Sequence, residues 1–330
     1  MSDSQSTPPN IVFLDAGTTD AGDLDFSQLE NLGQLTLHDR SDADEITERI
    51  ADAQIVLTNK TVITKEMIDA SPQLKLIQVV ATGYNNVDID AAKQRDIAVC
   101  NVSGYSTPGV AQHTITLLLN LATQIHSYAA EAAEWPKSPY FTRLNHPIRE
   151  LAGLTLGIAG MGTIGSLVAS IAESLGMNIV CLKREGQSES APSSDSSNRP
   201  RLNRDEFFTT CDAISLHCPL TPETHHLINA SSLEKMKSSA FLINTGRGDL
   251  IDEPELAEAL RNREIAGAAL DVLSSEPPPA DHILLNPGIP NLIITPHTAW
   301  ASYESRQRLL NGVVKNIQAF LTGESLNRLD

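Results

Sequence analysis

The chain has few cysteines, and their spacing indicates neither a disulfide framework nor a metal site. Four cysteines occur in 330 residues, with no C-x-x-C pair and no accompanying pair of histidines. Three of them lie in or beside apolar runs, which is typical of buried, reduced thiols. We therefore expect no metal in this protein. The four are Cys100, Cys181, Cys211 and Cys218.

The sequence also lacks an excess of basic residues, a long apolar run and a secretory signal. The formal net charge of -17 argues against binding to nucleic acid or to an anionic membrane surface, since such partners select basic patches. No apolar run reaches transmembrane length, and residues 1–7 have neither a basic nor an apolar region. These absences predict a cytoplasmic protein with no membrane and no nucleic-acid partner.

What is present is an alternation of short apolar runs with helical patterns, which predicts a parallel α/β fold. A length of 330 residues favours two domains. A helical pattern over 110–134 is long enough to bridge two domains, and 303–322 has the spacing of an amphipathic helix. The expected strands are residues 11–14, 35–38, 55–58, 76–80, 98–101, 178–182, 213–216, 241–244, 268–272 and 292–295.

Residues 187–200 interrupt this alternation. The segment is rich in serine, contains Pro192 and Pro200, and has no large apolar residue, so it predicts a surface loop. A tolerated insertion is the favoured interpretation, and a lid near the adenosine end of a cofactor is the alternative.

An apolar run at 154–159 leads into a G-x-G-x-x-G motif, and a helical pattern follows over 166–175. This order is typical of a dinucleotide-binding unit, in which glycines let the backbone approach a pyrophosphate at a helix N-terminus. A tight turn without a ligand is the alternative. We expect the cofactor at Gly160, Gly162, Thr163, Ile164 and Gly165.

The strand after this helix ends on Lys183 and Arg184. An acidic residue at this place normally binds the ribose 2′-OH of NAD. Two cations suit a 2′-phosphate instead, so the sequence predicts NADP, with NAD as the other possibility. The alternative interpretation is a solvated pair of cations at a strand end.

Polar residues follow the later strands, at the edge where parallel sheets bind their ligands. Hydride transfer to a 2-oxo acid needs a guanidinium to hold the substrate, an imidazolium to donate a proton and a carboxylate behind the imidazole. Arg247, His297 and Glu276 supply these three groups. Taken singly, Arg247 could cap a turn, His297 could be structural and Glu276 could be a loop carboxylate.

Five motifs, in this order along the chain, carry a family resemblance. They are ATGYNNVD at 81–88, GYST at 104–107, INTGRG at 243–248, DV with EP at 271–277, and TPHTAW at 295–300. With them the chain resembles the D-isomer-specific 2-hydroxyacid dehydrogenases, and within that family the glycerate dehydrogenases, also called hydroxypyruvate reductases.

The resemblance implies two Rossmann-like or flavodoxin-like domains with parallel sheets. A dinucleotide-binding domain, residues 103–298, would be inserted into a substrate domain formed by residues 1–102 and 299–330. Members of the family are commonly dimers paired through the cofactor domain, which implies a homodimer here.

The resemblance also implies further site residues. The substrate carboxylate would bind at the backbone of Thr82 and Gly83, opposite Arg247, with Trp300 at a position typical of hydroxypyruvate reductases. Asp271 matches a residue near the nicotinamide amide. Residues expected around the same ring are His217, Cys218, Pro219 and Thr245. Lys183 departs from the family pattern, because NAD-preferring members carry an acid there.

These observations predict an NAD(P)H-dependent oxidoreductase that reduces hydroxypyruvate or glyoxylate to the D-2-hydroxy acid. Two alternatives stay open. One is a dehydrogenase for another D-2-hydroxy acid, such as D-lactate or D-3-phosphoglycerate. The other is a dinucleotide-sensing co-regulator on the same fold.

Overall fold

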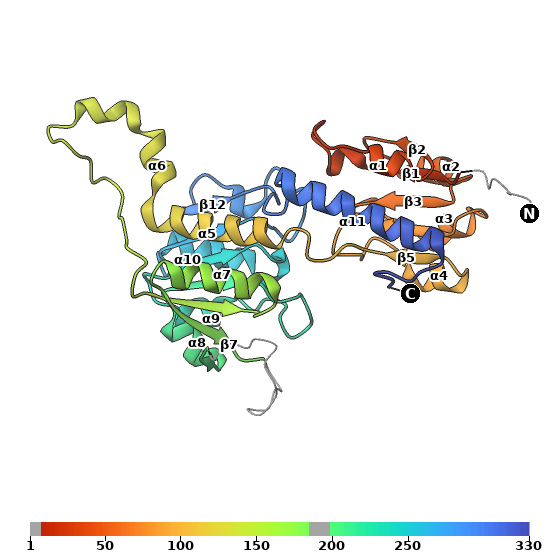
Figure 1. The fold of residues 1–330 in the computed structure, drawn as a ribbon. Coiled ribbons are helices and arrows are strands. Elements are labelled where there is room, and N and C mark those ends of the chain that lie inside the picture. Colours follow the sequence, from red (N-terminus) through yellow and green to blue (C-terminus); the bar gives the residue numbers. More distant parts are fainter. Residues whose placement is uncertain (1–7, 185–198, 330) are drawn as a thin grey trace, which may run out of the picture. The chain divides into compact units, whose positions relative to one another are not determined.

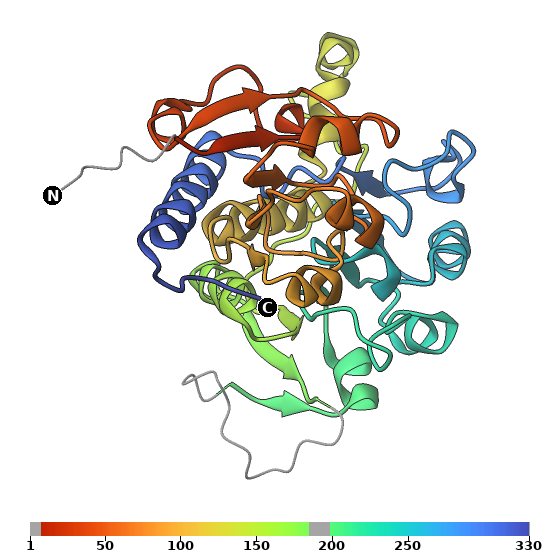
Figure 2. The same cartoon turned by 90° about the vertical axis from the view of Figure 1, so that its right-hand side faces the viewer.

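The computed structural model describes residues 8–184 and 199–329. The chain divides into two compact units, of which unit 1 comprises Met1–Ser106 and Ala301–Asp330, and unit 2 comprises Thr107–Trp300. Each unit is built on a parallel sheet with helices packed on it (Figures 1 and 2). The predicted α/β fold, with one domain inserted into a discontinuous other, is confirmed.

Unit 1 contains a five-stranded sheet in the order β2-β1-β3-β4-β5. All five strands agree with the predicted ones to within one residue at each end. Four of them are buried and read as continuous apolar runs, whereas β2 is largely exposed. The strands are β1 (Asn10–Phe13), β2 (Gln34–Leu37), β3 (Ile55–Thr58), β4 (Leu76–Val79) and β5 (Ala98–Cys100). The short helices between them are α1 (Ser27–Glu30), α2 (Ile46–Ile50), α3 (Lys65–Asp69) and α4 (Ile89–Gln94).

The last helix, α11 (Tyr303–Thr322), returns to this sheet and has the predicted bounds. Asn316 is buried and donates to the side-chain oxygen of Gln78 in β4 at 3.0 Å. A Cβ at Gly312 would come within 2.6 Å of the Val102 side chain, so the helix lies close against the end of β5. The chain therefore completes its first unit with its last segment.

Unit 2 contains a seven-stranded parallel sheet in the order β12-β11-β10-β9-β6-β7-β8. The chain runs outward from β6 through β8 and then returns to β9 beside β6, so the direction of winding reverses between these two strands. Such a switch point is where open α/β sheets bind their ligands. The strands are β6 (Thr155–Ala159), β7 (Asn178–Leu182), β8 (Arg201–Leu202), β9 (Ala213–Leu216), β10 (Phe241–Asn244), β11 (Gly267–Leu270) and β12 (Leu292–Ile294).

Apolar side chains of these strands alternate between two cores, one on each face of the sheet. Ile158 packs in the core that contains α5 (Thr107–Thr123) and α7 (Thr163–Ser174). Its neighbour Ala159 packs in the core formed with α8 (Arg204–Thr210), α9 (Ala230–Lys235) and α10 (Glu253–Arg261). Strand β8 was not predicted, because two residues are too short to show a period.

The prediction of one continuous helix over 110–134 is wrong. Helix α5 begins at Thr107 and ends at Thr123, and Gln124 adopts a left-handed conformation with φ 53°. The buried Gln124 amide donates to Leu121 O at 3.0 Å and to the Asn291 side chain at 2.7 Å, which fixes the break. The segment continues as α6 (Ile125–Ala130) and a 3-10 helix, η2 (Ala132–Lys137).

Two other predictions concern whole segments. Most of the predicted surface loop, residues 187–198, lies outside the described residues. Within the described part of the chain, every helix is too short or too polar to cross a membrane.

Candidate active site

The glycine motif forms the turn between β6 and α7, at the switch point of the unit 2 sheet. Gly160 has φ +103°, and a Cβ there would lie 2.4 Å from the backbone nitrogen of Cys218, so this turn packs directly on the segment after β9. A Cβ at Gly165 would meet the Gly160 carbonyl oxygen at 2.1 Å. By contrast, Gly162 has no heavy atom within 4 Å of its Cβ position. Two glycines therefore permit close packing, and the third leaves open space at the start of α7.

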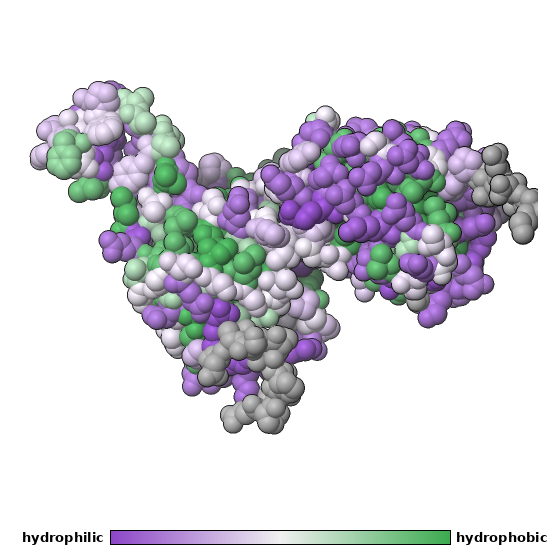
Figure 3. Space-filling view, viewed as in Figure 1, coloured by the Kyte–Doolittle hydropathy of each residue, from purple (hydrophilic) through white to green (hydrophobic). Residues whose placement is uncertain are grey.

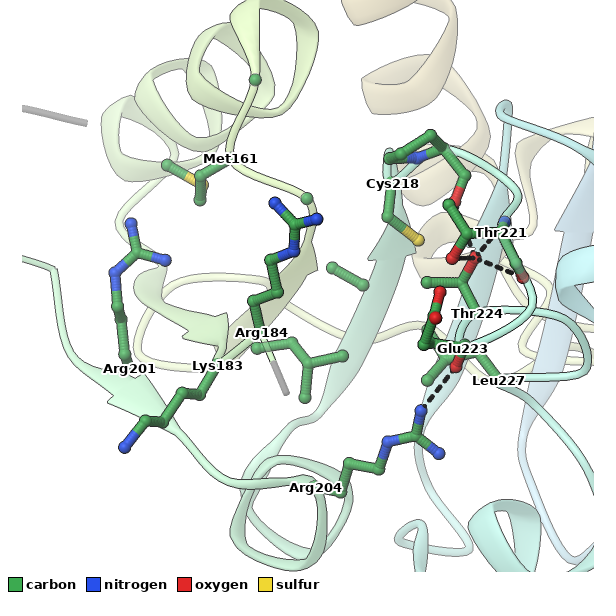
Figure 4. Close-up of a pocket in the computed structure, with 15 residues that line it drawn as sticks. Met161, Lys183, Arg184, Arg201, Arg204, Cys218, Thr221, Glu223, Thr224 and Leu227 are labelled. Carbon is green, nitrogen blue, oxygen red and sulfur yellow. Dashed lines mark hydrogen bonds between the residues drawn. The ribbon is translucent and has the colours of Figure 1, made fainter. Parts of the chain in front are cut away.

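A cavity of about 480 Å³ opens beside this turn (Figure 4). Gly160 and Gly162 line it together with Cys218 and Pro219 from the segment after β9. Among the described residues, its charged lining consists of one carboxylate, Glu223, and four cations, which are Lys183, Arg184, Arg201 and Arg204. Because cations outnumber the carboxylate, the cavity favours an anionic ligand.

The four cations differ in direction. Figure 4 shows Arg184 and Arg201 extending toward the side of Met161, whereas Lys183 extends away from Arg184. Arg204 donates to the Glu223 carbonyl oxygen at 2.9 Å. The sequence pointed to Lys183 and Arg184 but missed Arg201 and Arg204, which follow a segment without a readable pattern.

A dinucleotide fits these features. Helix α7 has 12 residues, and its first turn has no side-chain cap at Gly162, so its backbone N–H groups are available to a phosphate. Thr163 and Ile164 begin this helix, with Thr163 exposed and Ile164 half-buried. The open space at Gly162 is where a pyrophosphate could approach, and the cationic cavity adjoins it.

The segment after β9 carries His217 and Cys218, whose side chains are both kept uncharged by burial. Burial lowers the pKa of His217 to about 4, so the ring is neutral at pH 7, and it forms a 2.8 Å hydrogen bond with the Ser215 hydroxyl. Burial raises the pKa of the Cys218 thiol. This side of the site therefore offers neutral surface, and His217 is excluded as a proton donor at neutral pH.

His297 lies after β12 and is paired with Glu276. The Nδ1 atom of His297 is 2.6 Å from Oε2 of Glu276, and each side chain keeps about a third of its surface exposed. The second oxygen of Glu276 accepts a hydrogen bond from the Leu273 N–H at 3.0 Å. A carboxylate at Nδ1 leaves Nε2 as the atom that can exchange a proton with a substrate.

Asp271 holds the turn that carries His297. Its buried carboxylate accepts from the N–H groups of Thr298 and Ala299, both at 2.9 Å, and from the Thr295 hydroxyl at 2.5 Å. Its carbonyl oxygen accepts from the His297 N–H at 2.8 Å. The sequence associated Asp271 with the cofactor, whereas its visible contacts position the histidine.

Asn244 shapes the loop that carries Arg247. At the end of β10, its buried amide accepts from the Gly246 N–H at 2.9 Å and donates to the Arg247 carbonyl at 2.8 Å. The Arg247 side chain is exposed, and the Thr245 hydroxyl is 3.0 Å from that of Thr114 in α5. Asn244 was not predicted as a site residue, although an amide at a strand end before a glycine pair was a usable signal.

The structure places the three predicted catalytic residues in the loops that follow three adjacent strands. Arg247 follows β10, Glu276 follows β11 and His297 follows β12, and these strands are neighbours in the sheet. Of the remaining predicted residues, Trp300 is the last residue of unit 2. Thr82 and Gly83 belong to unit 1, in the bend after β4, where the Thr82 hydroxyl donates to Val102 O at 3.1 Å.

Comparison with known proteins gives a family match across the sheet just described. Residues 115–299 match the model of the D-isomer specific 2-hydroxyacid dehydrogenase, NAD binding domain. A hydroxypyruvate reductase of Blautia hydrogenotrophica is 39% identical over 96% of this chain and 98% of its own. A glycerate dehydrogenase of Methylorubrum extorquens is 38% identical with the same coverage.

The solved structures agree with these relatives. The TT0316 protein of Thermus thermophilus superposes with a TM-score of 0.84 at 33% identity, covering 97% of this chain and all of the other. The relatives and the fold thus match over nearly the whole length, and the family model matches residues 115–299. The chain belongs to the D-isomer-specific 2-hydroxyacid dehydrogenases.

Proposed function

We propose that this protein is a reductase of small 2-oxo acids, hydroxypyruvate or glyoxylate, which forms the D-2-hydroxy acid in the cytoplasm at the expense of NADPH. The observation that carries the proposal is the Glu276–His297 pair, joined at 2.6 Å beside the Arg247 loop at the carboxyl edge of a dinucleotide-type sheet. The names of the relatives at 38–39% identity support this substrate class.

In this reaction a nicotinamide held beside the glycine turn would supply the hydride for the 2-oxo carbon, and the side chains named above would bind the substrate and provide the proton. The exposed Arg247 guanidinium holds the substrate carboxylate and polarises the carbonyl, as a planar double donor can. Protonated His297 gives its Nε2 proton to the oxygen that becomes the hydroxyl. Glu276 stabilises the imidazolium and fixes its orientation.

We assign substrate binding to unit 1 and cofactor binding to unit 2, which follows the predicted division at residues 1–102 with 299–330 and 103–298. Thr82 and Gly83 would bind the substrate carboxylate through their N–H groups, and Trp300 would border the same substrate. In unit 2, Thr163 and Ile164 would contribute N–H groups to the pyrophosphate. The nicotinamide would contact the neutral segment 217–219, Thr245 and Asp271.

NADPH is the proposed cofactor because of the charge in the cavity beside the glycine turn. Among the residues that the structure describes, four cations and one carboxylate line this cavity, and Lys183 and Arg184 directly follow β7. A 2′-phosphate would add two negative charges close to Arg184 and Arg201, and charge-assisted hydrogen bonds to guanidinium are among the strong ones.

A homodimer is the proposed assembly. Helix α6 and η2 contain no buried residue, and the segment from Ile125 to Ile148 projects from unit 2 as an arm (Figure 1). Six large apolar side chains of this arm are at least half exposed: Ile125, Trp135, Tyr140, Phe141, Leu144 and Ile148. Figure 3 shows hydrophobic surface on the arm and on the adjoining face of unit 2 that carries α5 and α7. An uncovered apolar arm of this kind supports a partner that is a second copy of the chain.

A grid of initial rates tests the proposed activity. Purified protein is given hydroxypyruvate, glyoxylate, pyruvate or 3-phosphohydroxypyruvate, each with NADPH and with NADH. We expect the highest kcat/KM for hydroxypyruvate or glyoxylate with NADPH. Replacement of His297 by Ala should lower kcat by about 10²–10⁴-fold through loss of the proton donor. Absence of turnover with every acid would sink the enzyme proposal, and normal activity of His297→Ala would remove that residue from its role.

A further inference from the structure

One buried carboxylate of unit 2 has no part in the roles assigned above. Glu253 begins α10, and the residue is only 6% exposed. Its Oε1 accepts from the Ser274 N–H at 2.9 Å, and its Oε2 accepts from the Ser274 hydroxyl at 2.6 Å. The Nε2 atom of His282, itself nearly buried, lies 3.1 Å from the same Oε2. Burying a carboxylate is costly unless it is hydrogen-bonded, and these three contacts, to the two residues Ser274 and His282, meet that need.

Both partners of Glu253 belong to the segment that carries Glu276. This segment runs from Asp271, after β11, to the short helix η4 (Ile283–Leu285). Ser274 adjoins Leu273, whose N–H donates to Glu276 Oε1, and His282 closes the segment at the start of η4, where its Nδ1 accepts from Leu284 N. Glu253 therefore forms hydrogen bonds with this segment on both sides of Glu276.

The backbone at Leu273 and Ser274 also contacts the loop that carries Arg247. A Cβ at Gly248 would lie 2.0 Å from the Leu273 carbonyl carbon and 2.2 Å from the Ser274 nitrogen. The peptide that Glu253 holds through Ser274 is thus stacked on the residue that follows Arg247. A shift of Ser274 would be transmitted both to Glu276 and to the Arg247 loop, because closely packed groups cannot move independently.

We propose that Glu253, acting through Ser274 and His282, is a positioning residue that keeps the Glu276 carboxylate on His297 and the Arg247 loop in register with it. The inference rests on the proposed function. The bonds of Glu253 described above go to Ser274 and His282, so the effect proposed for it on the reaction is indirect. Without this anchor, Glu276 would sit on a segment with three consecutive prolines and few internal bonds, and its alignment with His297 would vary.

The test is Glu253→Gln, measured beside wild type, Glu276→Gln and the double variant. Gln keeps the size and one acceptor but loses the charge and the second acceptor. We expect kcat for 2-oxo acid reduction to fall about tenfold, the loss of one charge-assisted hydrogen bond, with the dissociation constant of NADPH unchanged. The double variant should be no slower than Glu276→Gln, because both changes remove the same alignment.

The pH–rate profile separates positioning from general stability. A carboxylate held less firmly stabilises protonated imidazole less, so the alkaline limb of kcat should move to lower pH in Glu253→Gln, in the same direction as in Glu276→Gln. The charged or titratable groups placed around His297 besides Glu276 include Asp271, which holds its turn, His113, 3.4 Å from Asp271, and Arg247 on the loop after the neighbouring strand β10, and all three stay unchanged. Amide hydrogen exchange of residues 271–285 should accelerate in the variant, an outcome that needs no turnover.

Asp212→Asn is the matched control. Asp212 accepts from the Thr155 N–H at 3.0 Å and from Lys237 at 2.9 Å, so the variant also loses a charged partner within unit 2. It directly precedes β9, at the amino end of the strands, whereas His297 follows β12 at their carboxyl end. We expect Asp212→Asn to lower the free energy of unfolding and to leave the alkaline limb of the kcat–pH profile where it is in wild type. If Glu253→Gln does not fold, Ser274→Ala, which removes only the 2.6 Å bond, should show the same shifts at smaller size.

The outcomes distinguish the two proposals. Wild type without turnover contradicts the proposed function, while exchange in 271–285 still decides whether Glu253 anchors the segment. An active wild type whose Glu253→Gln and Ser274→Ala variants keep the alkaline limb overturns the positioning role. A double variant slower than Glu276→Gln by the product of the single effects overturns it as well.

Discussion

The imidazoles of unit 2 differ because of what surrounds each ring. His217 is partly buried and forms a hydrogen bond with the neutral Ser215 hydroxyl, and burial lowers its pKa to about 4. His297 has a carboxylate at 2.6 Å and remains a third exposed. A ring that stays neutral at pH 7 is a poor general acid, whereas a carboxylate beside an imidazole stabilises its protonated form. The two environments therefore support the proposed role of His297 as the acid of the reaction.

The neutral state of His217 makes stability depend on pH. The ring has a lower pKa in the folded protein, about 4, than the ordinary 6.5, so the unfolded chain binds its proton first as pH falls. Wild type should lose about 2 kcal/mol of unfolding free energy from this group between pH 8 and pH 5. We expect His217→Gln to lack that part of the loss.

Urea unfolding followed by tryptophan fluorescence measures this effect, because Trp135 and Trp300 both lie in unit 2. Replacement of the exposed His225 by Gln serves as the control. An identical pH dependence in wild type and His217→Gln would show that the ring is not neutral in the folded protein.

We expect the cations beside the glycine turn to determine the choice between NADPH and NADH in the proposed enzyme. Replacement of Arg184 by Ala should raise KM for NADPH about 10–100-fold, the value of one charge-assisted hydrogen bond, and leave KM for NADH nearly unchanged. Lys183→Asp should move preference further toward NADH. The measurement is the ratio of kcat/KM for the two cofactors.

Lys235→Ala is the control for this ratio, since Lys235 pairs with Asp205 on the surface and does not line the cavity. A ratio unaltered by Arg184→Ala and Lys183→Asp would show that the 2′-phosphate binds elsewhere, or that NADH is the cofactor.

For single residues, the sequence predicted positions better than contacts. Arg247, Glu276 and His297 were predicted as catalytic because each follows a strand of one parallel sheet, and the structure has this arrangement, while their roles stay a prediction. The role of Asp271 in holding the histidine turn could not, because its partners are backbone N–H groups of residues 298 and 299. Glu253 was missed for a similar reason, since its partners lie 21 and 29 residues away.

At the scale of elements, the site depends on how closely two loops pack. Gly248 follows Arg247, and its Cβ position is occupied by the Leu273–Ser274 peptide. Gly248→Ala should therefore push the two loops apart, cost about 1–3 kcal/mol as overpacking does, and lower kcat by misaligning Glu276. Gly288→Ala, whose Cβ would find only Asn286 at 3.3 Å, is the matched control.

Unfolding free energy and kcat are measured together for both glycine variants. A Gly248→Ala protein with unchanged kcat would show that the two loops adjust without disturbing the reaction. Equal losses in Gly248→Ala and Gly288→Ala would show that any added methyl group has this effect.

Elements themselves were predictable where the period is long or the strand is buried. Helix α11 has the predicted bounds because its apolar spacing persists over 20 residues. The break at Gln124 was hidden, since the apolar spacing continues past it and the cause is a long-range bond to Asn291. Strand β8 pairs with β7 through two residues only, which leaves no pattern to read.

For the whole molecule, the split order of the two units followed from the position of the glycine motif near mid-chain and from the family resemblance. What no local pattern could predict is an arm without a buried residue. Short helices that bury nothing are marginal in water, so α6 and η2 need a cover that a single copy does not provide. Two copies that exchange arms would satisfy this need with one self-complementary contact.

The proposed homodimer can be tested through that arm. Light scattering should give a mass of twice 35.6 kDa for wild type and 35.6 kDa for the Phe141→Ser, Leu144→Ser double variant, because these side chains are 90% and 79% exposed in one copy. Val62→Ser, which alters a 56% exposed residue of unit 1, should stay dimeric. Each copy carries a formal charge of -17, so the dimer should tighten as added salt screens the repulsion. A monomeric wild type at every salt concentration would contradict the proposal, and a dimer that survives both arm substitutions would move the interface to another face.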